Sequence, residues 1–336
     1  MTMTKQNKKI YVGLMNRIAI SILLNQLMFA IFGAILPGAE DALILKFGGS
    51  MTLDAIFRTL ECIVYFISFT VPVAVFNRMN KNAEREIYEP VESGKKSPFD
   101  LFVIFGISLG AINLFAYVNY YIVNAFWDYS DFTQENFWAV ELDHPYQIVI
   151  YAIYAAFIPA LVEELMFRGT FCRVLTVYGK GTAVVISALL FALMHTNIEQ
   201  LLYTFVAGLC LGWIYVESKS LVLPFLLHFV NNGISVVLDV VRERVGIMEY
   251  DNASFFIEAA MWAMMALCLI IFLLGVLKRG RIAGKLQMKP DENGEEVLPL
   301  SFADKLGGFG SLGMILFVIY SFAVMTMFIL MSVGKV

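Results

Sequence analysis

Apolar stretches of about 20 residues recur along the 336-residue chain, and this recurrence restricts the fold more than any other feature. A helix of about 20 apolar residues crosses a hydrocarbon core about 30 Å thick, and a helix satisfies its own backbone polar groups there. The composition agrees, since 59% of the residues are hydrophobic, 15% are charged and the mean hydropathy is +0.73. We therefore predict an all-α, polytopic transmembrane helix bundle with eight or nine spans. The nine candidate spans are residues 14–36, 55–77, 100–126, 146–172, 181–199, 200–217, 221–241, 254–277 and 311–332.

The distribution of lysine and arginine predicts how the chain crosses the membrane, because cytoplasmic loops are enriched in both residues. A cytoplasmic N-terminus places most of them on the cytoplasmic side: Lys5, Lys8, Lys9, Arg78, Lys81, Arg85, Lys95, Lys96, Arg173, Lys180, Lys219, Lys278, Arg279, Arg281, Lys285 and Lys289. The other side then receives only Lys46, Arg242, Arg244 and Lys335. We predict an integral protein of the plasma membrane, whose surroundings are the lipid bilayer. The net charge of −4 argues against a nucleic-acid partner.

Three parts are expected along the chain. Residues 1–145 hold the first spans and an external acidic loop that carries Asp128, Asp131, Glu135, Glu141 and Asp143 and has no lysine or arginine. Residues 146–241 form the core with the chemically interesting side chains. Residues 242–336 hold the last spans and a polar cytoplasmic loop at 278–305, and a second polar loop is expected at 81–97. The four cysteines lie in or beside apolar runs, so no disulfide framework is predicted.

One apolar run contains the charged sequence VEELMFRG at residues 162–169. Glu164 and Arg168 are four residues apart, so they can form an ion pair along one helix face. Glu163 is rotated by about 100° from Glu164 on a helix. We therefore expect the two carboxylates to face different partners. Because a charge at the centre of a membrane helix costs about 2.5–3.5 kcal/mol, an unpaired Glu163 indicates a functional site inside the membrane.

Two of the three histidines lie in other apolar runs, His195 at the end of FALMH and His228 at the start of HFVNN. Phe191 and His195 are four residues apart, as are His228 and Asn232, so each pair shares a helix face. Counted from the cytoplasmic ends of their spans at 1.5 Å per residue, Glu163, His195 and His228 fall at similar depth, about 10–20 Å. Each residue alone also fits a structural role, as an ion pair, a core histidine or an interhelical amide.

The order EExxxR, FxxxH and HxxxN on successive membrane helices resembles the CPBP family of CAAX-protease and bacteriocin-processing membrane endopeptidases. The resemblance covers about residues 146–241. It implies that Glu163 and His195 activate a water molecule, that His228 and Asn232 stabilise the oxyanion, and that Glu164, Arg168 and Phe191 support them. A membrane-associated peptide or protein would be the substrate. We expect no cofactor, although Glu163, His195 and His228 are also a possible zinc ligand set.

Other functions remain open at this point. A non-proteolytic membrane scaffold or bacteriocin-immunity protein would have the same fold. A proton-coupled transporter also uses membrane glutamates and histidines, but we find no inverted repeat. A serine mechanism at Ser187 lacks an acid to orient His195. Gly308, Gly310 and Gly313 spell GxGxxG without the strand that a dinucleotide site requires. The sequence predicts no oligomeric state.

Overall fold

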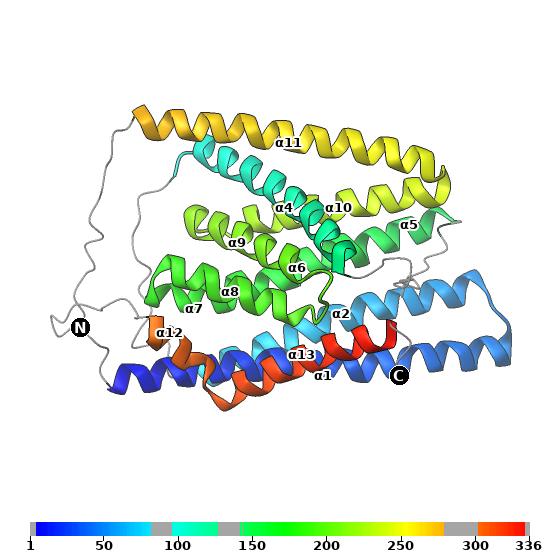
Figure 1. Cartoon of the computed structure of the whole chain (residues 1–336). Helices are drawn as coiled ribbons and strands as arrows, with labels where there is room; N and C mark the ends of the chain where they lie inside the picture. The colour runs from blue at the N-terminus through cyan, green and yellow to red at the C-terminus, as the bar shows by residue number, and fades with distance from the viewer. Residues whose placement is uncertain (1–4, 82–95, 127–141, 143, 279–301, 333–336) are drawn as a thin grey trace.

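The helices lie roughly along one direction in the computed structural model, which describes residues 5–81, 96–126, 142, 144–278 and 302–332 (Figure 1). Within these residues there is no β-strand. Seven helices are long and apolar enough to cross a membrane, and two shorter apolar helices, Lys180–Met194 and Leu312–Met327, coincide with two further predicted spans. The prediction of an all-α polytopic bundle is therefore confirmed.

The first two helices form an antiparallel pair, α1 (Lys5–Phe47) and α2 (Met51–Asn80). Gly48 adopts a positive φ of 79° in the turn, a conformation that glycine allows without strain. The buried Asn25 side chain donates to the Ser68 carbonyl oxygen at 2.8 Å, which ties the two helices together at mid-length. α1 is much longer than the predicted span 14–36, because the helix continues through the polar residues at both ends.

The charged sequence lies in a continuous but irregular helical rod, a run of six short helical segments that follow one another without a break. It comprises α5 (Pro145–Ala152), the π-helical η1 (Ile153–Phe157), α6 (Ile158–Met166), the π-helical η2 (Phe167–Cys172), α7 (Arg173–Leu175) and the 3₁₀-helical η3 (Thr176–Tyr178). The predicted span 146–172 is therefore not a uniform α-helix. π-Helical turns interrupt membrane and soluble helices most often at functional sites, and here two of them enclose the nine residues of α6.

Three further helices surround this rod: α8 (Lys180–Met194), α9 (Leu201–Ser218) and α10 (Val222–Arg244). α8 and α9 approach closely at Gly208, where a Cβ atom would lie 2.8 Å from the Ala188 Cα atom. Gly212, one turn on, faces Val184. These two glycines thus let the backbones of α8 and α9 approach closely within the bundle. α8 ends at Met194, earlier than the predicted span 181–199.

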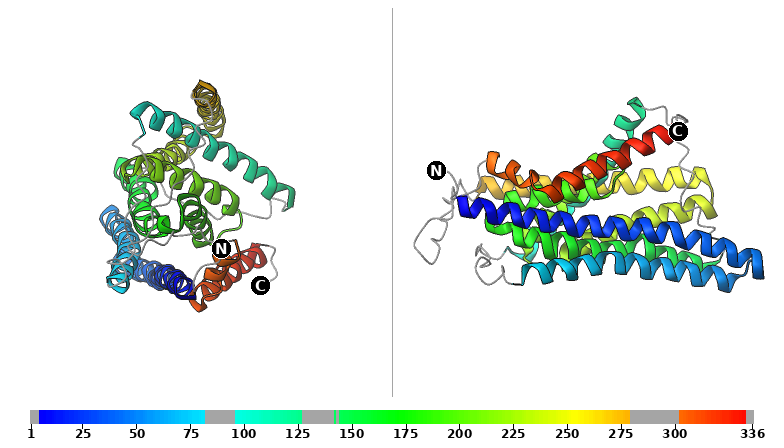
Figure 2. Two further views of the ribbon diagram at one scale, coloured as in Figure 1. Left: turned by 90° about the vertical axis from the view of Figure 1, so that its left-hand side faces the viewer. Right: turned by 90° about the horizontal axis from the view of Figure 1, so that it is seen from below.

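The remaining helices cover two opposite sides of the bundle. α4 (Pro98–Phe126) packs against α9 and α11 (Ile247–Lys278), and its Gly106 and Gly110 face Cys268 and Met265 of α11. α12 (Phe302–Phe309) and α13 (Leu312–Ser332) pack on α1. Seen along the helices, α6, α8, α9 and α10 lie between the α1, α2 and α13 side and the α4 and α11 side (Figure 2).

Gly308 and Gly313 have a structural explanation. A Cβ atom at Gly308 would lie 2.5 Å from the Tyr11 ring, and the Gly313 backbone N–H donates to the Asn16 side-chain oxygen at 2.7 Å. Both contacts join α12 and α13 to α1. The GxGxxG pattern is therefore helix packing, as the missing strand predicts.

The start of α1, the end of α2, the start of α4 and the end of α11 lie at one end of the bundle (Figure 1). This arrangement is compatible with the predicted gathering of basic residues on one side, and the cytoplasmic orientation stays a prediction. The acidic residues of the predicted external loop lie outside the described residues. Most of each predicted polar loop, 81–97 and 278–305, also lies outside the described residues.

Candidate active site

The charged sequence at the end of α6 and the start of η2 is buried inside the bundle. Glu163, Glu164 and Arg168 expose 4%, 1% and 0% of their surface. α6 packs against α2 on one side and α10 on another, so these side chains face protein and not lipid. Buried charges are stable only when they are paired or hydrogen-bonded, so their partners define the site.

Glu164 and Arg168 form the predicted pair, with the Arg168 Nη1 atom 2.9 Å from the Glu164 Oε1 atom. The guanidinium also donates from Nη2 to the Gly208 carbonyl oxygen at 3.1 Å. Its Cζ atom lies 4.6 Å from the centre of the Phe191 ring, in a cation–π contact. Arg168 thus fastens α6 to α8 and α9 while it neutralises Glu164.

His228 on α10 contacts both carboxylates. Its Nδ1 atom lies 3.0 Å from the Glu164 Oε1 atom, and its Nε2 atom lies 3.9 Å from the Glu163 Oε2 atom. The prediction that the two glutamates face different partners is wrong. Two side chains about 100° apart on one helix can flank a single imidazole, because its two nitrogens lie on different sides of the ring.

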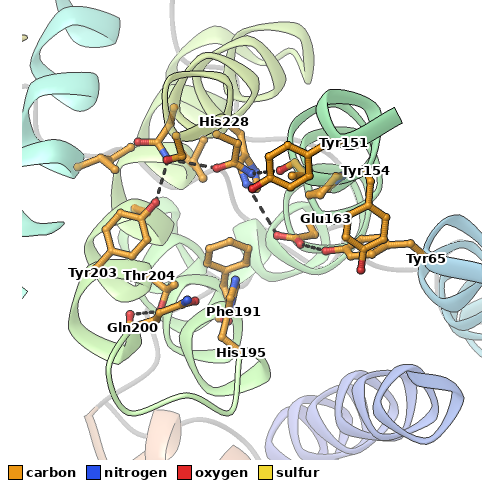
Figure 3. Close-up of a pocket in the computed structure, with 18 residues that line it drawn as sticks. Tyr65, Tyr151, Tyr154, Glu163, Phe191, His195, Gln200, Tyr203, Thr204 and His228 are labelled. Carbon is orange, nitrogen blue, oxygen red and sulfur yellow. Dashed lines mark hydrogen bonds and ion pairs between the residues drawn. The ribbon is translucent and has the colours of Figure 1, made fainter. Parts of the chain in front are cut away.

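A cavity of about 490 Å³ opens beside Glu163. Among the predicted site residues, Glu163, Phe191, His195, His228 and Asn232 all line it (Figure 3). Glu164 and Arg168 lie outside the lining and support it from behind. The rest of the wall is uncharged, with aromatic, aliphatic and polar side chains: Tyr65, Ile112, Tyr151, Tyr154, Ala155, Pro159, Gln200, Tyr203, Thr204, Ala207, Leu211, Asn231 and Ser235. The three predicted motifs therefore converge on one cavity.

His195 lies directly after the last residue of α8, Met194. The prediction placed it inside the span 181–199, so the helix ends earlier than expected. Its Nδ1 atom is 2.7 Å from the Phe191 carbonyl oxygen. A carbonyl oxygen only accepts, so Nδ1 carries the hydrogen, and Nε2 of the neutral ring keeps its lone pair. The ring also packs edge-on against Phe191, with centroids 4.7 Å apart. This geometry presents His195 as a hydrogen-bond acceptor.

The Asn232 amide is already engaged by its neighbours. Its Nδ2 atom donates to the Ala155 carbonyl oxygen at 3.3 Å, and its Oδ1 atom accepts from Asn231 at 3.2 Å. Asn231 also donates to the Tyr203 hydroxyl at 2.8 Å. A primary amide nitrogen carries two hydrogens, so one Asn232 N–H remains for a ligand. These contacts fix the orientation of the amide.

Sequence reasoning missed two polar residues of the site. Asn231 directly precedes Asn232 in HFVNN, and the repeated asparagine was an available signal. Tyr65 on α2 donates from its hydroxyl to the Glu163 Oε1 atom at 2.6 Å. A tyrosine within an apolar run carries no spacing signal, so this contact needed the fold. The predicted alternative nucleophile, Ser187, is fully buried and donates to the Phe167 carbonyl oxygen at 3.1 Å.

The possible zinc ligands Glu163, His195 and His228 do not form a ligand set. Within the part of the chain that the structure describes, no three histidine, cysteine, aspartate or glutamate side chains gather closely enough to hold a metal ion. The Nδ1 atoms of both histidines are engaged, one by Glu164 and the other by a backbone carbonyl. We therefore derive no catalytic step through a metal.

Fold and site together define a polytopic membrane protein with a buried glutamate–histidine–asparagine cluster beside an internal cavity. Residues 145–234 match the family described as type II CAAX prenyl endopeptidase Rce1-like. A curated relative, the membrane-embedded CAAX protease MroQ of Staphylococcus aureus (strain USA300), is 27% identical over 116 residues, which cover 32% of this chain. This segment is therefore similar to the CPBP/CAAX protease family, in agreement with the resemblance of its motifs.

The match spans only about half of that relative, 47% of its length. No solved structure matches the chain.

Proposed function

We propose that the protein is an intramembrane endopeptidase that hydrolyses peptide bonds of membrane-associated peptides or proteins. The observation that carries the proposal is the placement of Glu163. Its Oε2 atom has no hydrogen-bond donor among the described residues, although it is buried 3.9 Å from His228 in a site shared with His195 and Asn232. An unpaired buried carboxylate oxygen is costly, and such groups concentrate where chemistry needs them. The family match of residues 145–234 supports the same reaction class.

In the proposed reaction, the Glu163 Oε2 atom accepts a proton from a water molecule, and the water oxygen attacks the carbonyl carbon of the scissile bond. His195 Nε2 accepts a hydrogen bond from the same water and orients it. The carbonyl π electrons move onto oxygen, which forms a tetrahedral oxyanion. The C–N bond then breaks, and Glu163 returns the proton to the leaving amine nitrogen. Atoms and charge balance without a covalent enzyme intermediate.

The oxyanion is stabilised by donors that the protein orients in advance. Asn232 contributes its remaining N–H. His228 donates from Nδ1 to Glu164, so its Nε2 atom donates to the oxyanion when the ring is protonated. The Glu164 carboxylate accepts from His228 Nδ1 and orients that ring, while Arg168 holds the carboxylate in place. Phe191 contacts both the Arg168 guanidinium and the His228 ring, with its ring centre 4.6 Å from Arg168 Cζ and 6.1 Å from the His228 ring centre.

The test compares wild-type protein with Glu163→Gln, which keeps the side-chain size but removes the base. We expect a loss of proteolysis by at least about 100-fold, since general-base catalysis contributes about 10²–10⁴-fold. Glu61→Gln is a matched control, because Glu61 is a membrane glutamate that pairs with Arg58 on α2 outside the cavity lining. Comparative N- and C-terminal peptidomics of membranes from both strains would identify the cleaved substrates. Full activity of Glu163→Gln would refute the proposal.

Two further measurements separate the alternatives. A cellular phenotype that survives both Glu163→Gln and His195→Ala at normal protein levels would favour a non-proteolytic scaffold. The metal-free reaction predicts that dialysis against a chelator leaves the activity of the purified protein unchanged. An activity that disappears on dialysis and returns with zinc would contradict that part of the mechanism.

A further inference from the structure

The Tyr65 hydroxyl reaches the proposed base from a helix outside the family-matched segment. Tyr65 lies on α2, 98 positions before Glu163 in the sequence, and donates to the Glu163 Oε1 atom at 2.6 Å. The same residue lines the cavity, where it lies beside Glu163 (Figure 3). Hydrogen bonds from a hydroxyl to a carboxylate are short and about twice as strong as those between neutral groups.

Three aromatic neighbours hold the Tyr65 ring. It stacks on Phe69 at 5.3 Å with 16° between the ring planes. Phe29 of α1 and Tyr154 of η1 meet it edge-on at 5.2 and 5.6 Å. Because these three contacts restrict the ring, they also restrict the direction in which the hydroxyl points.

The two oxygens of Glu163 consequently have different roles. Oε1 is occupied by Tyr65, while Oε2 has no donor and faces His228 at 3.9 Å. A carboxylate with one oxygen fixed in this way cannot rotate freely about its last bond. The oxygen that faces His228 is therefore the one available to take a proton.

The first helix pair also touches the other side of the site. The Gln26 side chain of α1 donates to the carbonyl oxygen of Met194 at 2.8 Å, directly before His195. α2 thus contacts Glu163 directly, and α1 contacts the residue that precedes His195.

We propose that Tyr65 is a positioning residue that aims the Glu163 Oε2 atom into the cavity, so that α1 and α2 complete the site of the matched segment 145–234. This inference rests on the proposed function. Tyr65 itself does not touch the reacting atoms. Its effect on the reaction passes through the orientation of the Glu163 carboxylate, where a misplacement of about 1 Å can cost about 100-fold in rate.

The test is Tyr65→Phe in the full-length purified protein, assayed against a substrate peptide identified by the peptidomics. Phenylalanine keeps the aromatic packing and removes only the hydroxyl. We expect kcat to fall about 10- to 100-fold, with KM within about twofold of wild type and the protein still folded at the assay temperature. Tyr11→Phe is the matched control, because it removes another phenol hydrogen bond between helices, from Tyr11 to the Lys305 carbonyl oxygen, far from the cavity.

A combined variant separates positioning from a general structural role. In Glu163→Gln the residual rate no longer depends on the base, so adding Tyr65→Phe should lower it by less than about twofold. Wild-type kcat in Tyr65→Phe, or an equal loss in both backgrounds, would overturn the inference while the proposed function stands. Full activity of Glu163→Gln would instead overturn the proposed function itself.

Discussion

Removal of Arg168 tests whether the glutamate pair is held as the structure describes. Arg168→Met replaces a fully buried guanidinium with an apolar chain of similar reach and leaves the buried Glu164 carboxylate with only His228 as its partner. Breaking a buried ion pair by removing one partner costs about 3–5 kcal/mol. His228 Nδ1 remains 3.0 Å from Glu164 and can still donate to it. We therefore expect the free energy of unfolding to fall by about 3 kcal/mol, the lower end of that range.

The double variant Glu164→Gln with Arg168→Met should recover most of that loss. Glutamine removes the unpaired negative charge yet keeps an oxygen that accepts from His228. Arg58→Met is the matched control, since that arginine pairs with Asp54 and Glu61 at 30% side-chain exposure. Because this pair is only partly buried, its loss should lower the melting temperature less than the loss of the fully buried Arg168.

Thermal unfolding in detergent micelles, followed with a thiol-reactive fluorophore, provides the measurement. Cys62, Cys172 and Cys268 are free and buried, so they react mainly after unfolding. An Arg168→Met midpoint equal to that of wild type would refute the reasoning. So would a double variant that melts no higher than Arg168→Met alone, because the cost would then not come from the unpaired carboxylate.

Three further substitutions test the packing around the site. Gly208→Ala should destabilise more than Gly212→Ala, because the new Cβ atom would meet the Ala188 backbone at 2.8 Å in the first case and the Val184 side chain at 3.0 Å in the second. We expect a loss of about 1–3 kcal/mol for Gly208→Ala, and equal midpoints for the two variants would contradict it. Thr196 has a φ of 48°, which is strained for a β-branched residue. Thr196→Gly should therefore raise the melting temperature by relieving about 1 kcal/mol, and a lower temperature would show that the threonine side chain matters more than the strain.

The number and order of the spans were predictable because run length and hydropathy are direct requirements of a bilayer. The ends of the helices were not predictable, because polar residues such as Lys8 or Asn80 can extend a helix into the membrane–water interface at a small cost in free energy. α1 therefore exceeds its predicted span, whereas α8 ends before His195.

The candidate site was predictable to the extent that it depends on contacts within one helix. Four-residue spacing was sufficient to predict the pair of Glu164 with Arg168. The contact of His228 with both glutamates depends on how α6 and α10 are rotated, which spacing along either helix does not encode. The Tyr65 contact depends in addition on the packing of α2, so neither was accessible without the fold.

The two π-helical segments around α6 have a consequence for how this chain tolerates changes in length. Deletion of one residue from η1 would convert its π-helical turn into an α-helical turn. It would also rotate α6 by about 100° relative to α5. Glu163 would then face away from Tyr65 and His228 without any change in its own identity. By contrast, substitutions between apolar residues at the exposed positions Leu161 and Leu165 leave that face in place. Among natural variants, the length of this helix should accordingly be held more strictly than its outward-facing residues.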